Sequence, residues 1–133
     1  MTEITLQSVT KSWGALTALK PIDLHIPHGE FLVLLGPSGC GKTTTMRIIA
    51  GLETASTGKV LKDGADITNR LPRERNMAMV FQNYALYPHM KVLDNVAYPL
   101  RARGMAKAER EKTALAALEK VGLAPYADRL PKN

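Results

Sequence analysis

The apolar positions near the N-terminus alternate with polar ones, a pattern typical of strands with one buried face. Residues 4–9 and 22–26 both alternate in this way, and we expect them to pair. Two shorter runs, 59–62 and 65–67, flank Asp63-Gly64, which predicts a hairpin with a tight turn. The first part of the chain is therefore predicted to build an antiparallel sheet.

Two continuous apolar runs, 31–35 and 77–81, predict strands of a second kind. Runs without alternation are typical of strands that are covered on both faces, as in the parallel sheets of α/β proteins. Helices are predicted from Lys42 to a stop at Gly51, over 92–103 and over 106–121. The pattern as a whole predicts an antiparallel β piece, an α/β core and then helices.

Composition narrows the class of protein. The 133 residues, 45% of them hydrophobic, are enough for one domain with a core. The net charge of the whole chain is +6, and residues 101–133 carry eight basic and four acidic side chains of it. Because no recognition motif or aromatic interleaving accompanies that charge, a solvated helical face is favoured and no nucleic acid is expected.

Neither a membrane span nor a leader is predicted. No apolar run approaches the roughly 18 to 20 residues that cross a bilayer, and the first residues lack a secretory pattern. The single cysteine rules out a disulfide within the chain and suits a reducing compartment. These features predict a cytosolic location.

The most specific motif is the phosphate-binding pattern GxxxxGK[ST], between the predicted strand 31–35 and the helix that follows. Its glycines let the backbone curl and point N–H groups at phosphate oxygens. Lys42 would reach the β- and γ-phosphates, and the Thr43 hydroxyl would hold Mg²⁺. The alternative is a glycine-rich turn with an exposed lysine. The predicted nucleotide-binding residues here are Gly36, Pro37, Ser38, Gly39, Cys40, Gly41, Lys42, Thr43 and Thr44.

Together with this loop, the segments 80–90 and 94–100 resemble the ATP-binding subunit of an ABC transporter, closest to importers of the sugar and glycerol-phosphate kind. The likeness covers essentially all 133 residues. It implies one truncated α/β domain with a P-loop NTPase core. Residues 1–82 would hold the antiparallel β subdomain and the core, and 83–133 the Q-loop and the start of the helical subdomain.

The resemblance also implies roles for residues outside the loop. Trp13 would stack on the adenine of ATP, the alternative being a core tryptophan. Gln82 would contact Mg²⁺ or position water, the alternative being a solvated amide. The loop Tyr84–Met90 would dock onto the transmembrane permease, unless its rings pack beneath the next helix. Lys91 replaces a threonine that is common in the family, which removes a helix cap.

Several parts of the family's machinery are not found in the chain: the signature segment, the acidic strand that holds Mg²⁺, the catalytic glutamate and the switch histidine. The family hydrolyses ATP in a dimer at the cytoplasmic face of the membrane, and that energy drives solute uptake. We therefore expect the complete protein to do so, and these residues alone to bind ATP weakly and hydrolyse none. Core packing is expected to suffer from the absent strand.

Other classes of protein also contain a phosphate loop of this kind. The chain could be a non-hydrolytic module that binds ATP or a full-length partner. A GTPase is disfavoured because no Asn-Lys-x-Asp sequence occurs, and a small-molecule kinase because the arginines at 101, 103 and 110 resemble helix-surface charges. Alkylation of Cys40 is expected to block nucleotide binding by crowding the β-phosphate position.

Overall fold

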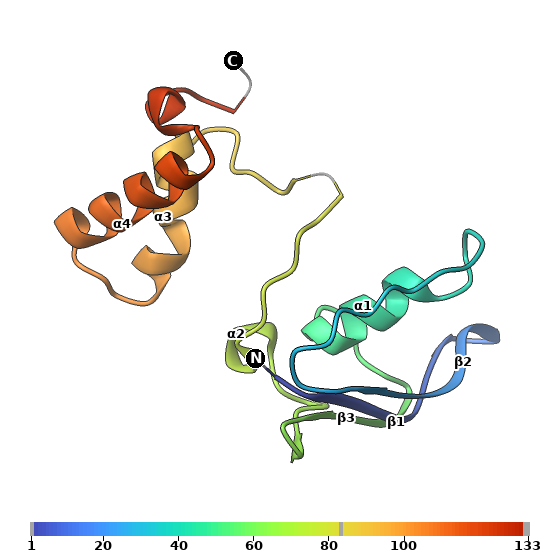
Figure 1. The fold of residues 1–133 in the computed structure, drawn as a ribbon. Helices are drawn as coiled ribbons and strands as arrows, with labels where there is room; N and C mark the ends of the chain where they lie inside the picture. The colour runs from blue at the N-terminus through green and yellow to red at the C-terminus, as the bar shows by residue number, and fades with distance from the viewer. Residues whose placement is uncertain (1, 83, 132–133) are drawn as a thin grey trace. The chain divides into compact units, whose positions relative to one another are not determined.

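The computed structural model describes residues 2–82 and 84–131. It divides the chain into two compact units, Met1–Met79 and Val80–Asn133. Figure 1 shows the sheet and α1 in the first unit, and α3 and α4 in the second. Each unit is described by itself.

The first unit contains a four-stranded antiparallel sheet in the order β2-β1-β3-β4. Its strands are β1 (Ile4–Trp13), β2 (Leu16–Ile26), β3 (Thr57–Lys62) and β4 (Ala65–Asp66). Both predicted pairings are confirmed, because Leu6 pairs with Leu24 and Lys62 pairs with Ala65. The long strands extend to Trp13 and Leu16 through register shifts after Leu6, which interrupt the alternation there.

Helix α1 (Lys42–Ala50) closes the core of the first unit against this sheet. Ile48 packs with buried side chains from β1, β2, β3 and the segment after β4: Leu6, Val9, Leu19, Val60 and Ile67. Burial of side chains of this size stabilises a fold by about 1.5–3 kcal/mol each. The helix ends at Gly51, whose φ of 77° is left-handed, as predicted. The short helix α2 (Pro72–Arg75) follows the sheet.

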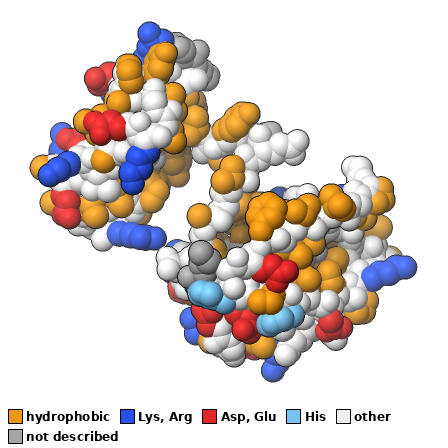
Figure 2. Space-filling view, viewed as in Figure 1, with side chains coloured by type: hydrophobic (Ala, Val, Ile, Leu, Met, Phe, Trp, Pro, Cys, Tyr) orange, Lys and Arg blue, Asp and Glu red, His pale blue; other side chains and the backbone are white. Residues whose placement is uncertain are grey.

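The predicted strands at 31–35 and 77–81 are wrong, since neither run is extended in a sheet. Phe31 is 89% exposed, Leu35 87% and Val80 88%. A buried strand needs hydrogen-bonded neighbours at its edges, and no strand of the described residues pairs with either run. Figure 2 shows hydrophobic side chains at the surface of the first unit over α1 and the segment leading into it.

The second unit is built on two packed helices, α3 (Val92–Ala102) and α4 (Lys107–Lys120), followed by the 3₁₀ turn η1 (Ala124–Tyr126). Both predicted helices are confirmed within one or two residues at each end. Their contact buries small and aliphatic side chains: Ala97, Ala114, Leu118 and, after η1, Ala127.

The start of α3 is capped by distant backbone rather than by a side chain. The N–H groups of Val92 and Leu93 donate to the carbonyls of Arg129 and Ala127, at 2.8 and 2.9 Å. Lys91 Nζ donates to Asp128 Oδ1 at 2.7 Å. The missing threonine cap is thus replaced by the segment after η1.

No helix in residues 2–82 and 84–131 is long and apolar enough to cross a bilayer.

Candidate functional site

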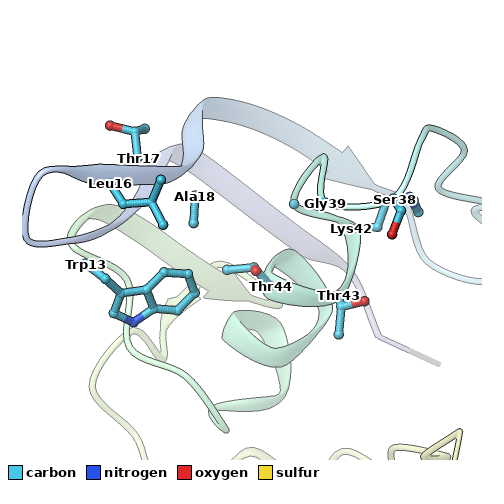
Figure 3. Close-up of a pocket in the computed structure, with 10 residues that line it drawn as sticks. Trp13, Leu16, Thr17, Ala18, Ser38, Gly39, Lys42, Thr43 and Thr44 are labelled. Atoms are coloured by element: carbon cyan, nitrogen blue, oxygen red, sulfur yellow. The ribbon is translucent and has the colours of Figure 1, made fainter.

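A pocket of about 480 Å³ lies between the turn that joins β1 to β2 and the loop that opens α1. Figure 3 shows the Trp13 ring at one end and Ser38, Gly39 and Lys42 at the other. The residues that line it are Trp13, Leu16, Thr17, Ala18, Ser38, Gly39, Gly41, Lys42, Thr43 and Thr44. The structure therefore brings Trp13 together with most of the predicted loop residues.

The loop runs close against strand β2 at Gly41. This residue has a φ of 94°, which side chains rarely adopt. An added Cβ would lie 2.9 Å from Leu19 Cδ1 and 3.2 Å from the Ala18 carbonyl oxygen. The backbone angle therefore favours glycine here, and a side chain would also crowd Leu19 and Ala18.

The first turn of α1 presents backbone donors at the pocket. Thr45 N–H donates to the Gly41 carbonyl at 2.8 Å, and the buried Thr45 hydroxyl donates to the same oxygen at 3.0 Å. The amides of Lys42, Thr43 and Thr44 precede this bond, so they have no acceptor within the helix. Such amides, with the positive end of the helix dipole, favour an anion.

Lys42 places a positive charge inside the curl of the loop. Its Nζ donates to the carbonyl oxygens of Gly36 and Pro37, both at 2.7 Å, and lies 3.4 Å from Cys40 Sγ. Gly36, Pro37 and Cys40 thus surround the ammonium group rather than line the pocket. These contacts hold the ammonium group against the backbone of the loop.

The Trp13 side chain is only half buried, so it is not a core tryptophan. Trp13 is the last residue of β1, and a two-residue turn joins it to Leu16. Leu16, Thr17 and Ala18 also line the pocket, and sequence reasoning missed them. The hairpin of β1 and β2 places these residues opposite Trp13. Extending the predicted first strand as far as Trp13 would have indicated this position from the sequence.

The far end of α1 is held by Arg75, which the sequence placed only in a polar connection. The side chain is buried, with 3% exposure. Its Nη1 donates to the carbonyls of Ile48 and Ile49 at 2.7 and 2.9 Å, and Nη2 to that of Thr68 at 2.8 Å. Burial lowers the pKa of Arg75, but a guanidinium stays charged in proteins.

The remaining predicted residues belong to the second unit. Gln82 is exposed in a turn. In the loop Tyr84–Met90, Tyr84 is 81% exposed, whereas the Tyr87 ring lies 4.7 Å from that of Tyr98 in α3. The loop therefore has one exposed ring, Tyr84, and one ring that packs on the next helix, Tyr87.

Asn95 of α3 fixes the shape of the loop Tyr84–Met90. Its Oδ1 accepts from Tyr87 N–H at 2.8 Å, and its Nδ2 donates to the carbonyls of Tyr87 and Met90 at 3.1 and 3.0 Å. One side chain thus ties the loop to the helix at several points. These hydrogen bonds hold the C-terminal end of the loop.

Sequence comparison identifies close relatives of the chain. Residues 19–133 match the family model described as ABC transporter. A Fe(3+) ions import ATP-binding protein from Rhizobium etli is 52% identical over 96% of this chain and 36% of its own length. An alpha-glucoside transport ATP-binding protein from Rhizobium meliloti is 47% identical over 99% of this chain and 36% of its own. The chain spans about a third of the length of these curated relatives.

Structure comparison agrees. A dimeric ATP-binding cassette in a post-hydrolysis state with bound ADP and Pi superposes with a TM-score of 0.83 and 35% identity. The match covers 97% of this chain and 62% of the cassette. It confirms the predicted fold class, a truncated α/β domain of the P-loop cassette type. The chain therefore belongs to the ABC transporter family.

Proposed function

We propose that the chain is part of an importer's ATP-binding subunit and binds MgATP in the pocket between Trp13 and the phosphate loop. The observation that carries this proposal is the pocket itself, which joins an aromatic ring to a helix start with free amides and a lysine. Adenine would stack on Trp13, and the triphosphate would lie along Ser38 to Thr44.

The side chains present fit a magnesium nucleotide. Lys42 Nζ would exchange the Gly36 and Pro37 carbonyls for phosphate oxygens, which carry more negative charge. Thr43 lines the pocket, and its hydroxyl is the type of oxygen ligand that Mg²⁺ takes. The ion would neutralise part of the phosphate charge.

The whole protein is proposed to hydrolyse ATP as a dimer and to drive solute uptake. Tyr84–Met90 would contact the permease, because an exposed aromatic surface hydrogen-bonded to a helix is typical of a docking site. We propose that the subunit lies at the cytoplasmic face of the membrane. The solute is proposed to be a sugar or related organic compound, which the alpha-glucoside relative supports, although the iron relative is more similar in sequence.

A second candidate is a nucleotide-binding module without turnover, and the exposed run 31–35 favours it for this chain alone. That run leads directly into the phosphate loop, and it has no strand partner among the described residues. A loop with an unsupported entrance is expected to position phosphate loosely. We therefore propose that these 133 residues bind ATP weakly and release no phosphate.

Calorimetric titration of the chain with MgATP tests the proposal, with Lys42→Ala and, as a matched control, Lys20→Ala on the exposed side of β2. Binding in the range of about 0.1–1 mM is expected for the wild type and the control, and none for Lys42→Ala. Equal binding by Lys42→Ala, or a clear preference for GTP over ATP, would contradict it. Phosphate release above that of Lys42→Ala would contradict the absence of turnover.

A further inference from the structure

We propose that Lys11 is a positioning residue for the base, holding the Trp13 ring from outside the pocket so that its other side can stack on adenine. The inference rests on the proposed function, since it adds a residue behind the proposed adenine contact. Lys11 would touch no nucleotide and would act only through the Trp13 ring.

Lys11 is a buried lysine with a full set of partners. It is 7% exposed, and its Nζ lies 2.6 Å from Glu53 Oε1. The same ammonium donates to the Thr54 carbonyl at 2.8 Å and lies 3.4 Å from the Thr54 hydroxyl. A buried charge is tolerated when it is paired and hydrogen-bonded in this way, and its position is then fixed.

This fixed ammonium lies over the indole of Trp13. Nζ is 5.4 Å from the ring centroid, within the range of a cation–π attraction. Lys11 and Trp13 are two residues apart near the end of β1. The contact restrains a large side chain that is otherwise half exposed at a strand end.

The residues that hold the Lys11 ammonium group are separate from those that line the pocket. Trp13 lines the pocket, whereas Lys11, Glu53 and Thr54 do not. Figure 3 shows the ring at the opposite end of the pocket from Ser38, Gly39 and Lys42. Lys11 therefore contacts the indole without taking up the space that the pocket offers a base.

The partners of Lys11 also connect the ring to the phosphate loop. Glu53 follows α1, and its N–H donates to the Arg47 carbonyl of that helix at 3.2 Å. The start of the same helix forms the phosphate end of the pocket. Lys11 thus fixes the ring relative to the helix that holds the phosphates, and this spacing must match the length of a nucleotide.

The test compares two ligands that differ in the base, MgATP and magnesium tripolyphosphate, by calorimetric titration of the full chain. Lys11→Met keeps an unbranched side chain that is one atom shorter and removes its charge. We expect it to weaken MgATP binding about three- to tenfold and to leave tripolyphosphate binding unchanged. Lys20→Met, at an exposed lysine of β2, is expected to change neither.

A double-mutant cycle separates positioning from a purely structural role. In a Trp13→Ala background, Lys11→Met should weaken MgATP binding no further, because the ring through which Lys11 acts is gone. The emission of Trp13, the single tryptophan of the chain, should respond to MgATP less strongly in Lys11→Met than in the wild type. A lysine that only supported the fold would weaken both ligands alike, with or without the ring.

Each outcome decides the inference. An unchanged ratio of the two affinities in Lys11→Met, or an equal loss of both ligands by a folded variant, would overturn it. If Lys11→Met does not fold, Glu53→Gln decides, since loosening the ammonium should lower the same ratio and an unchanged ratio overturns the inference. A wild type that binds neither ligand refutes the proposed function, whereas one that binds both equally refutes only the adenine contact and the role of Lys11.

Discussion

Arg75 stabilises α1 from the end opposite to the pocket. Its guanidinium donates to two terminal carbonyls of the helix, and a Cβ at Gly51 would lie only 2.6 Å from Arg75 Nε. A cation at a helix C-terminus is also favoured by the helix dipole. The helix that carries the phosphate loop is therefore anchored at both ends, by Gly41 against β2 and by Arg75.

Removing this charge should destabilise the first unit. Arg75→Met removes the guanidinium donor from the partly buried carbonyls of Ile49 and Thr68 and leaves the Ile48 carbonyl only its bond from Gly51 N–H. The free energy of unfolding should therefore fall by about 3 kcal/mol. Urea unfolding followed by circular dichroism measures the change. Arg73→Met is the matched control, since that side chain is 79% exposed, and its effect should stay within about 0.5 kcal/mol. Equal effects of the two variants would show that the buried contacts contribute nothing specific.

At the scale of elements, α3 depends on the segment that follows η1. The backbone carbonyls of Ala127 and Arg129 accept its first N–H groups, and the Lys91–Asp128 pair joins the same two segments. The ammonium of Lys91 holds the pKa of Asp128 below its ordinary value of 3.8. In return Asp128, with a smaller effect of Asp94, raises the pKa of Lys91 above 10.5.

The pair should make the stability of the second unit depend on pH. Because the pKa of Asp128 is lowered by folding, its contribution is present above pH 3.8 and is lost as pH falls through the folded value. Because the pKa of Lys91 is raised, its contribution is present below pH 10.5 and is lost as pH rises through the folded value. Asp128→Asn should therefore reduce the free energy of unfolding at neutral pH and have no effect at either extreme.

Urea unfolding of the wild type and Asp128→Asn across this range measures that difference. Glu119→Gln, at an exposed carboxylate of α4, is the control and should show no such profile. The effect at neutral pH should be small, because both charges of the pair are exposed to solvent and screened by salt. A difference that does not vary with pH would contradict a role for the ion pair.

For the molecule as a whole, the features that the sequence predicted are those encoded locally. The alternation in 4–9 and 22–26 specifies one buried face, and the phosphate loop is contiguous, so both could be read from neighbouring residues. Lys11 and Arg75 could not be found in this way. Their partners Thr54 and Ile48 lie 43 and 27 residues away, and only the fold brings them together.

The two wrong strands have a different cause. Apolar content in 31–35 and 77–81 indicates that these side chains favour burial, but it does not supply the neighbouring strands that burial requires. Among the described residues β2 and β4 are the edge strands of the sheet, and neither pairs with these runs. The phosphate loop nevertheless keeps its shape, because Lys42, Gly41 and Leu19 fix it from the side of α1 and β2.

The central claim is that the loop around Lys42 binds the phosphates of a nucleotide, and a crystal structure of the chain with magnesium and a non-hydrolysable ATP analogue tests it most directly. The account predicts that Lys42 Nζ leaves the carbonyls of Gly36 and Pro37 for the β- and γ-phosphates, with the base on the Trp13 ring. An analogue bound elsewhere, or a Lys42 side chain directed into solvent beside a bound nucleotide, would contradict it.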